Sequence, residues 1–393
     1  MKKQCNNKKA FAEKADKILD DIYADVFPDQ DLKSEFIEVF NTSSWQRSGP
    51  VIISSDYEID GNLAIDSDGS EYPVQKLSNG DFIFLAENIP PLGSKVFKIV
   101  KRKSVKFDKI KVENNILSNG QIQIKLDQKG SIASLKWKGT NLIEKSGFNK
   151  YYYLSGKNPD DAVTIDNGKI KVHEQGPVFS SLLVESTPPG CKKMQQEVRL
   201  YNSKLNWIEI VNTLDKKAIR DKESVHFAFP FDIPDGQVRL HIPGAIIEPE
   251  KDQLKGANRN FISLDKGLDI SNQDFGVTLA TVDAPLIEIS DMHAEHNHWM
   301  KHLPESQKIY SYALNNYWHT NYKADQNGII KYEYVLKPHG KIDQAAIQKF
   351  NLERARPFHL RRAKNFNSSK ESLFFIESQG IIVEEISLTP DNE

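Results

Sequence analysis

The sequence predicts a mainly β protein, and two observations lead to that prediction. Short apolar segments recur between turn residues, and in residues 121–127 the side chains of Ile122, Ile124 and Leu126 alternate with polar ones, as in a half-buried antiparallel strand. In addition, the sequence has no repeating strand–helix–strand pattern and no glycine-rich phosphate loop. A barrel or doubly wound enzyme fold is therefore not expected.

A helix is expected before the first strand. Residues 6–27 carry apolar side chains at helical spacing, and Pro28 ends the pattern. The apolar positions are Phe11, Ala15, Ile18, Leu19, Ile22, Tyr23 and Val26. One helix cannot bury such a stripe alone. We therefore expect it to pack on the β domains that follow, on a second copy of the chain in a homo-oligomer, or within a helical bundle.

The β segments form two groups. Closely spaced turn clusters in residues 29–104 predict a small β-sandwich, and the longer strands of residues 105–350 predict a large two-sheet sandwich. Residues 343–350 predict a short capped helix. The tail, residues 351–393, contains two strand-like pieces at 373–376 and 381–383. They either extend an earlier sheet or begin a truncated β domain.

Composition excludes several classes of protein. The 393 residues include 52 basic and 54 acidic side chains, and the net charge of −2 implies no nucleic-acid partner. Two cysteines, Cys5 and Cys191, provide no disulfide framework. No apolar run is long enough to span a membrane, and the N-terminus does not read as a signal peptide. A cytoplasmic and a periplasmic location both remain open.

The segment from 276 to 328 carries the clearest functional signal. Two apolar strand-like runs and a histidine-rich loop lead into residues 311–328, where amide side chains stand beside Tyr, Trp and His rings. Amides can hydrogen-bond sugar hydroxyls, and aromatic rings can cover the apolar face of a sugar. The segment therefore predicts a carbohydrate-facing surface, and the structural alternative is an edge strand that runs into a polar turn.

Several segments in order along the chain resemble the C-terminal β region of glycoside hydrolase family 38, the retaining α-mannosidases. They are residues 40–47, 117–120, 130–135, 276–289 and 315–322, together with Arg356-Pro357. The resemblance implies a large supersandwich similar to galactose mutarotase, preceded by a small β-sandwich and by a helix, residues 1–28, that ends a helical bundle.

The resemblance also implies what this chain lacks. Members of the family hold their zinc ligands and nucleophilic aspartate in an N-terminal barrel that opens with a His-x-Asp motif, and none of the ten histidines here is followed two positions later by Asp. We therefore expect no catalytic residue and no metal or other cofactor in this chain, with zinc in the missing catalytic domain. The site residues carried over are sugar contacts: Asn315, Asn316, Trp318, Asn321 and Gln326.

Other candidate sites are weaker. Hydrolysis with retention needs two carboxylates about 5 Å apart, and the candidate pairs are Asp160 with Asp161, Glu248 with Glu250, and Asp291 with Glu295. All lie in turn-like stretches, so we interpret them as solvated loop acids. The histidines of one loop, His293, His296, His298 and His302, have spacings that metal ligands use, but no cysteine accompanies them.

Three functional hypotheses follow. The first is the non-catalytic C-terminal portion of an α-mannosidase, which supports hydrolysis of α-mannosides by the missing barrel and lines its substrate site. The second is a free-standing carbohydrate-binding or structural β-sandwich module. The third, an aldose mutarotase, requires a His and Glu pair facing a sugar cleft, and the sequence shows no motif that supplies one.

Overall fold

The computed structural model describes residues 2–30, 33–103, 107, 110–294, 299–317, 323–369, 371–374, 376 and 380–383, with side chains from residue 7 onward. The chain divides into two compact units. We call residues 13–108 and 344–393 the small β unit, and residues 1–12 and 109–343 the large β unit. The mainly β prediction is confirmed, and among the described helices none is long and apolar enough to cross a membrane.

The two predicted helices are present with shifted ends. Helix α1 (Lys2–Val26) begins earlier than the predicted residue 6, and α2 (Gln344–Ala355) continues past the predicted residue 350. Helix α2 belongs to the small β unit, and its Ile347 and Phe350 are buried. On α1, Tyr23 is half-buried, whereas the rest of the predicted stripe from Phe11 to Val26 is exposed.

The small β unit is built on one seven-stranded sheet in the order β2-β5-β4-β3-β6-β1-β27. Its elements are β1 (Phe36–Asn41), β2 (Arg47–Ile53), η1 (Ser55–Tyr57), β3 (Leu63–Asp66), β4 (Glu71–Lys76), β5 (Phe82–Ile89), β6 (Gly93–Val100), β27 (His359–Ala363) and η3 (Phe366–Ser368). Ile37 of β1 and Val51 of β2 share one hydrophobic core although four strands separate β1 from β2 in this order. The sheet therefore curls over on itself.

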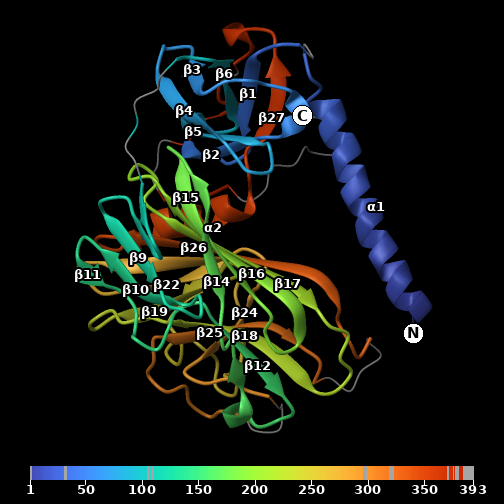
Figure 1. Cartoon of the computed structure of the whole chain (residues 1–393), viewed down its shortest axis with the longest axis vertical. Helices are drawn as coiled ribbons and strands as arrows, with labels where there is room; N and C mark the ends of the chain where they lie inside the picture. Colours follow the sequence, from blue (N-terminus) through green and yellow to red (C-terminus); the bar gives the residue numbers. More distant parts are fainter. Residues whose placement is uncertain are drawn as a thin grey trace. The chain divides into compact units, whose positions relative to one another are not determined.

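The C-terminal part of the chain returns to the small β unit. Strand β27 pairs antiparallel with β1, from Phe36 opposite Ala363 to Phe40 opposite His359, and the two lie side by side in Figure 1. Trp45 donates from its indole nitrogen to Glu353 of α2 at 2.7 Å. The predicted boundaries placed residues 344–350 in the large sandwich and residues 351–363 in a separate tail. In the structure, residues 344–363 belong to the small β unit.

The tail after β27 forms no strand among its described residues. Leu373 is 83% exposed and Ile381 50% exposed, so the two strand-like pieces predicted at 373–376 and 381–383 are wrong for the residues that the structure describes. Local apolar character is not enough, because a strand needs a partner with free backbone groups.

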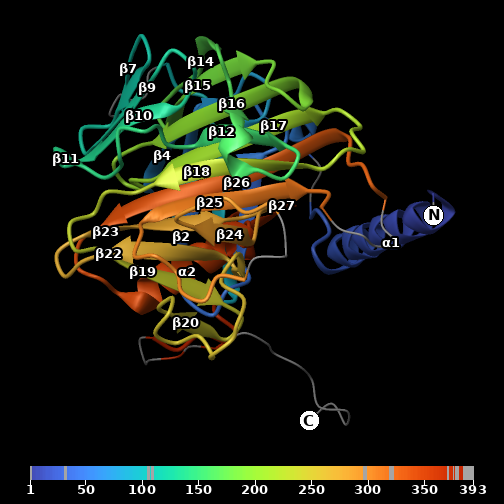
Figure 2. The ribbon, with the colours of Figure 1, turned by 90° about the horizontal axis from the view of Figure 1, so that it is seen from below.

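The large β unit contains a nine-stranded sheet, β14-β15-β16-β17-β26-β23-β22-β19-β20, and a six-stranded sheet, β13-β12-β18-β25-β24-β21. Figure 2 shows β16, β17 and β26 following one another across the larger sheet. A five-stranded sheet, β11-β10-β9-β8-β7, completes the unit. The predicted large sandwich is therefore present, with a third sheet in addition.

The strands of the large β unit, and the short helix η2 between β12 and β13, have the following bounds. They are β7 (Lys111–Glu113), β8 (Ile116–Ser118), β9 (Ile122–Leu126), β10 (Ile132–Trp137), β11 (Thr140–Asn141), β12 (Lys150–Ser155), η2 (Pro159–Asp161), β13 (Val163–Thr164), β14 (Lys169–Gln175), β15 (Phe179–Ser186), β16 (Cys191–Tyr201), β17 (Ile208–Lys216), β18 (Glu223–Pro230), β19 (Gln237–Ile242), β20 (Ala245–Ile247), β21 (Ile262–Ser263), β22 (Gly267–Ser271), β23 (Gly276–Thr281), β24 (Leu286–Ile289), β25 (Lys308–Asn315) and β26 (Gly328–His339).

One core joins the six- and nine-stranded sheets. Phe227 and Phe229 of β18 point to the same side, and Phe229 contacts Tyr334 of β26 with ring centroids 4.8 Å apart. The alternate residues of β18, Ser224 and His226, therefore point to the opposite face of the six-stranded sheet. That face carries the first candidate site.

Candidate functional site

The predicted carbohydrate-facing segment begins where β25 ends. Asn315 is the last residue of β25 and pairs with Ser224 at the start of β18. The side chain of Asn316 is fully used by backbone: its Oδ1 accepts from the Glu223 amide at 2.7 Å, and its Nδ2 donates to the carbonyls of Asp221 at 2.7 Å, Ile219 and Ala324. Asn316 thus holds two loops together.

The other predicted sugar contacts lie in different environments. Asn315 is half-buried, and its Oδ1 has no hydrogen-bond partner among the described residues. Gln326 is exposed just before β26. Trp318 and Asn321 lie outside the described residues. Contact of these five side chains with a sugar stays a prediction. The Asn316 oxygen already accepts a backbone hydrogen bond, whereas the Asn315 oxygen is buried without a partner among the described residues.

A buried polar network lies beside this segment. His226 and Glu288 are fully buried, and His226 Nδ1 lies 2.9 Å from Glu288 Oε2. On the other side of the imidazole, Nε2 lies 2.9 Å from Ser224 Oγ. Glu288 Oε1 also accepts from the backbone amide of His293 at 2.8 Å. The serine, histidine and glutamate therefore form one continuous chain of polar contacts.

Aromatic side chains cover the network. The ring of Tyr312 stacks on His226 with centroids 4.6 Å apart and planes 7° from parallel. Tyr317 packs with Tyr312, Leu154 and Ala294 in a small hydrophobic cluster. Burial, and then the charge of Glu288, raise the pKa of the Tyr312 hydroxyl. The network is shielded from solvent, so its geometry suits the positioning of β18, β24 and β25 rather than proton transfer to a ligand.

Sequence analysis missed this pair. It found no His and Glu pair of the mutarotase type, yet the fold brings His226 and Glu288 together from strands far apart in sequence. Both side chains are buried, however, and do not face an open cleft as that activity requires. The signal in the sequence that could have indicated the buried pair is a charged residue inside an apolar strand, Glu288 in Leu286-Ile287-Glu288-Ile289. A buried charge needs a partner, but sequence spacing does not identify it.

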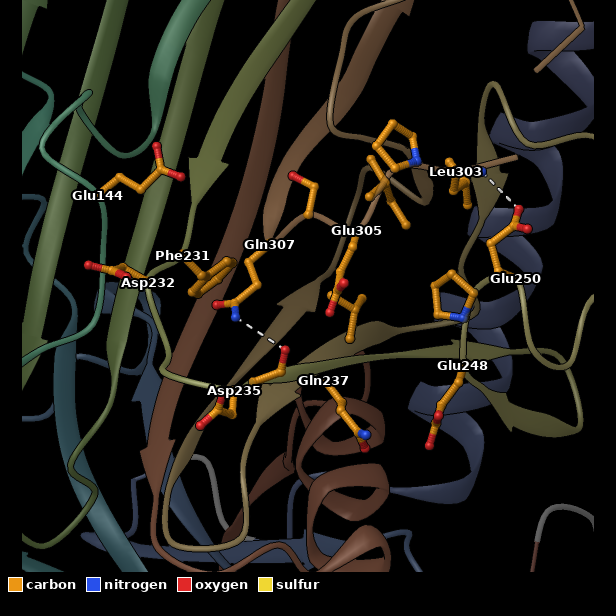
Figure 3. A pocket seen from close by; sticks show the side chains of 16 residues that line it. Glu144, Phe231, Asp232, Asp235, Gln237, Glu248, Glu250, Leu303, Glu305 and Gln307 are labelled. Atoms are coloured by element: carbon orange, nitrogen blue, oxygen red, sulfur yellow. Dashed lines mark hydrogen bonds between the residues drawn. The ribbon is translucent and has the colours of Figure 1, made fainter. Parts of the chain in front are cut away.

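A second candidate site is an open cavity of about 760 Å³ within the large β unit. Figure 3 shows carboxylates arranged around it, with the Phe231 side chain between Asp232 and Gln307. Six acidic residues line it: Glu144, Asp232, Asp235, Glu248, Glu250 and Glu305. No basic side chain is among the lining residues. The cavity thus presents mainly hydrogen-bond acceptors.

Gln307 fixes one wall of this cavity. Its amide nitrogen donates to the carbonyls of Ile233 at 2.7 Å and Gly236 at 3.1 Å, and its amide oxygen accepts from the Ile233 amide at 2.8 Å. The bonds hold the loop that carries Asp232 and Asp235. Neither of these two aspartates forms an ion pair with a described residue, and both are exposed. They are therefore available to accept hydrogen bonds from a ligand.

Glu250 forms the opposite wall. The backbone amide of Leu303 donates to Glu250 at 2.8 Å, and His302 and Arg259 also contact its carboxylate. The Leu303 hydrogen bond, followed by those of His302 and Arg259, lowers the pKa of Glu250 to about 2. Glu248 and Glu250 thus line a shared cavity, which differs from the interpretation of this pair as solvated loop acids.

The other acid pairs and the histidine loop do not form a catalytic or metal centre among the described residues. Asp160 and Asp161 are exposed in η2, and Asp291 is exposed while Glu295 lies outside the described residues. His293 lies near Glu288, whereas His302 contacts Glu250. His296 and His298 lie outside the described residues. No three His, Cys, Asp or Glu side chains gather as metal ligands in the described part of the chain.

Comparison with known proteins places this geometry in context. Residues 117–284 match the sequence profile of the glycosyl hydrolases family 38 C-terminal domain. No curated protein sequence matches the chain. Two solved structures from Enterococcus faecalis are similar in fold: an alpha-mannosidase, at 14% identity and a TM-score of 0.62, and a protein in glycosyl hydrolase family 38, at 13% identity and a TM-score of 0.61.

The alignments cover 90% of this chain and 48% of the alpha-mannosidase, and 89% of this chain and 50% of the second protein. This chain therefore spans about half the length of these structures. A galactose 1-epimerase from Lactobacillus acidophilus aligns over 60% of this chain and 99% of its own, at 10% identity and a TM-score of 0.39. That similarity is too low to support an argument.

Proposed function

We propose, on the premise that residues 117–284 are a glycosyl hydrolases family 38 C-terminal domain, that this chain is the non-catalytic β portion of an α-mannosidase. In this role it supports hydrolysis of α-mannosides by a catalytic domain that the chain itself does not supply. It also lines the substrate site of that domain. The match of residues 117–284 to the family profile is the observation that carries the proposal.

The chemistry of the described residues supports a non-catalytic role. Retaining hydrolysis needs two carboxylates about 5 Å apart on either side of the scissile bond. Two carboxylates beside the Asn315 segment are already used inside the protein: Glu223 pairs with Lys216 at 2.7 Å, and Glu288 contacts His226. The described residues also do not assemble a ligand set that fits zinc. The proposed role therefore assigns no metal to the described residues.

A sugar contact at the end of β25 is the second part of the proposal. Asn315 Oδ1 is a buried acceptor with no protein partner among the described residues, and a buried acceptor of this kind calls for a partner such as a hydroxyl. Exposed Gln326 is a further candidate, together with Trp318 and Asn321. Asn316 acts indirectly, because it holds the backbone on which Asn315 is mounted. With only part of a substrate site present, binding of a free monosaccharide is expected to be weak.

Activity of the isolated chain tests the first part. We expect no hydrolysis of an aryl α-mannoside, with or without added zinc, because the chain contributes no described nucleophile or metal site. The measurement is release of the aryl alcohol at high protein concentration, with and without a chelator. Turnover that a chelator abolishes would show that the non-catalytic assignment is wrong.

Ligand titration tests the second part. Methyl α-mannoside, followed by NMR, is expected to bind with a millimolar or weaker dissociation constant, on the order of −4 kcal/mol or less favourable. The Asn315→Ala variant should weaken binding further, and Gln326→Ala is a second variant on the same surface. Methyl α-galactoside is the matched control ligand. Equal shifts for both sugars, unchanged by Asn315→Ala, would contradict a mannoside contact at this site.

A free-standing carbohydrate-binding module is the second candidate function. The acidic cavity favours it, because every lining residue belongs to the large β unit and no other polypeptide is needed to form it. Such a module should bind an oligosaccharide with micromolar affinity in the isolated chain. Asp232→Asn should then reduce that affinity while Asn315→Ala leaves it unchanged, which is the reverse of the outcome expected for the first candidate.

A further inference from the structure

Four asparagines of this chain are followed by glycine: Asn79, Asn119, Asn167 and Asn327. Asparagine is chemically labile in this context, because the amide nitrogen of a glycine, which has no Cβ to hinder its approach, can attack the asparagine side chain. The attack requires a side chain that is free to turn toward the main chain and a glycine amide that is not already donating a hydrogen bond. The four sites differ in both respects.

The fold holds the side chains of Asn79 and Asn119. Asn79 Oδ1 accepts from the amide of Asp81 at 3.1 Å, and its Nδ2 donates to the Asp81 carboxylate at 2.7 Å. Asn119 Oδ1 accepts from the amide of Ile122 at 2.7 Å, and its Nδ2 donates to the carbonyl of Tyr201 at 2.9 Å. Each side chain must break these hydrogen bonds before its Cγ can approach the next residue. Both sites are therefore protected.

Asn327 is less restrained. Its Oδ1 accepts from Lys323 Nζ at 2.8 Å, and both side chains are exposed. Gly328, however, is the first residue of β26 and lies opposite Lys216 of β17 in the sheet. Strand pairing fixes the main chain here, which opposes the closing of a ring between the two residues. We therefore rank Asn327 second.

Asn167 has neither restraint among the described residues. It lies between β13 and β14, it is exposed, and no hydrogen bond joins its side chain to a described residue. The amide of Gly168 likewise donates to no described residue. The two reacting groups, the side-chain carbonyl carbon and the glycine nitrogen, can therefore meet without first breaking a hydrogen bond to the described part of the chain.

We propose that Asn167 is the site of a spontaneous deamidation. The Gly168 nitrogen bonds to Cγ of Asn167, the Cγ–Nδ2 bond breaks, and Nδ2 leaves as ammonia with the proton that the glycine nitrogen gives up. The product is a cyclic imide. Water then opens the imide by adding its hydroxyl to either ring carbonyl and its proton to the ring nitrogen, which yields aspartate or isoaspartate. The reaction needs only water, and the inference does not depend on the proposed function.

Isoaspartate would disturb the start of β14, because it lengthens the main chain by a methylene immediately before Gly168. The surroundings of Gly168 leave little room: an added Cβ would lie 2.7 Å from Val184 Cγ1 and 3.1 Å from the carbonyl oxygen of Lys129. The next residue, Lys169, is the first of β14 and pairs with Glu185 of β15. Since β14 is an edge strand of the nine-stranded sheet, the disturbance should stay at this edge.

Ageing of the full chain in mildly alkaline buffer tests the site. Trypsin releases residues 158–169 as one peptide, and mass spectrometry of the digest measures the conversion at each of the four asparagines. We expect Asn167 to convert at least about fivefold faster than Asn79 or Asn119, the factor expected when a hydrogen bond must first break. Asn327 should come second. Conversion at any of the other three sites as fast as at Asn167 would overturn the proposal.

Hydrogen exchange tests the structural consequence. Aged wild-type protein should exchange the amides of β14 faster than fresh protein, because isoaspartate displaces the start of this strand. Asn167→Gln is the matched control: its longer side chain closes the ring far more slowly, so its exchange should not change with age. Fresh Asn167→Asp, which carries the new charge on a normal backbone, should exchange like fresh wild type. An equal increase on ageing in Asn167→Gln, or no increase in converted wild type, would overturn this consequence.

Discussion

At the scale of single residues, His339 is a titrating group whose contribution to stability has a definite sign. Its Nε2 lies 2.7 Å from Asp269 Oδ2, and its Nδ1 contacts the carbonyl of Gly340 at 2.8 Å. Burial lowers the pKa of His339, but the hydrogen bond to Asp269 and the charge of that carboxylate outweigh it, so the pKa is raised above the ordinary value of 6.5. Folding therefore favours the protonated imidazole.

Because the pKa of His339 is higher in the folded than in the unfolded state, removing this side chain should change the stability by an amount that depends on pH. A raised folded-state pKa stabilises the protein below the unfolded-state pKa, and that contribution is lost as pH rises through the folded-state pKa. His339→Gln should therefore cost about 1–2 kcal/mol near pH 5.5 and less near pH 9. Melting temperatures of variant and wild type, compared at both pH values, measure the difference. If His339→Gln and Asp269→Asn each lowered the melting temperature by the same amount at both pH values, the pair of His339 with Asp269 would not be charged.

At the scale of elements, Gly130 determines how closely the five-stranded sheet approaches the nine-stranded one. It lies in the turn between β9 and β10 with a φ of +92°, where side chains other than glycine are strained, and an added Cβ would overlap Val184 of β15. Asp127 Oδ1 accepts from the amides of Lys129 and Ser131 and fixes the turn. Two separate requirements therefore select glycine at this position.

Comparison with a second glycine separates the two requirements. Gly139, in the next turn, has a similar φ of +88° but open space where a Cβ would lie. Gly139→Ala should cost about 1 kcal/mol from backbone strain alone, whereas Gly130→Ala should cost about 1–3 kcal/mol more because a packed neighbour must move. Chemical denaturation of both variants measures the difference. Equal losses of unfolding free energy in the two variants would mean that Val184 moves aside at no cost and that only the backbone conformation matters.

At the scale of the whole molecule, the small β unit is assembled from two distant parts of the sequence. β27 covers the edge of β1, and Arg361 Nε donates to Glu38 Oε2 at 2.7 Å in a pair that is almost completely buried. Trp45 and Arg47 likewise bond to Glu353 and to the carbonyl of Arg356. Residues 13–108 therefore do not complete their own core.

Truncation tests this dependence. A chain that ends at residue 343 leaves Glu38 buried without its partner, and breaking such a pair costs about 3–5 kcal/mol, in addition to the lost strand. We expect rapid proteolysis within residues 29–100, while residues 110–343 remain resistant. A chain that ends at residue 369 keeps α2 and β27 and serves as the control. Equal resistance of the two truncated chains would refute the dependence.

The sequence by itself determined the elements that rest on local pattern. Alternating side chains such as Ile122, Ile124 and Leu126 specified β9, and helical spacing specified α1 to within a few residues of its ends. The mainly β class followed, because periodicity reports which side of an element is buried. The short motifs predicted a family whose C-terminal domain profile residues 117–284 match, although they did not reveal that residues 40–47 serve to hold α2.

Only the tertiary structure decided which distant residues meet. It joined β27 to β1, paired His226 with Glu288, and gathered Glu144, Asp232 and Glu250 around one cavity. It also showed that Asn316 is used by backbone while the Asn315 oxygen is buried without a partner among the described residues, a distinction between adjacent residues of one type. Long-range pairing depends on which edges and buried charges remain unsatisfied after the other strands have paired, and no local pattern contains that information.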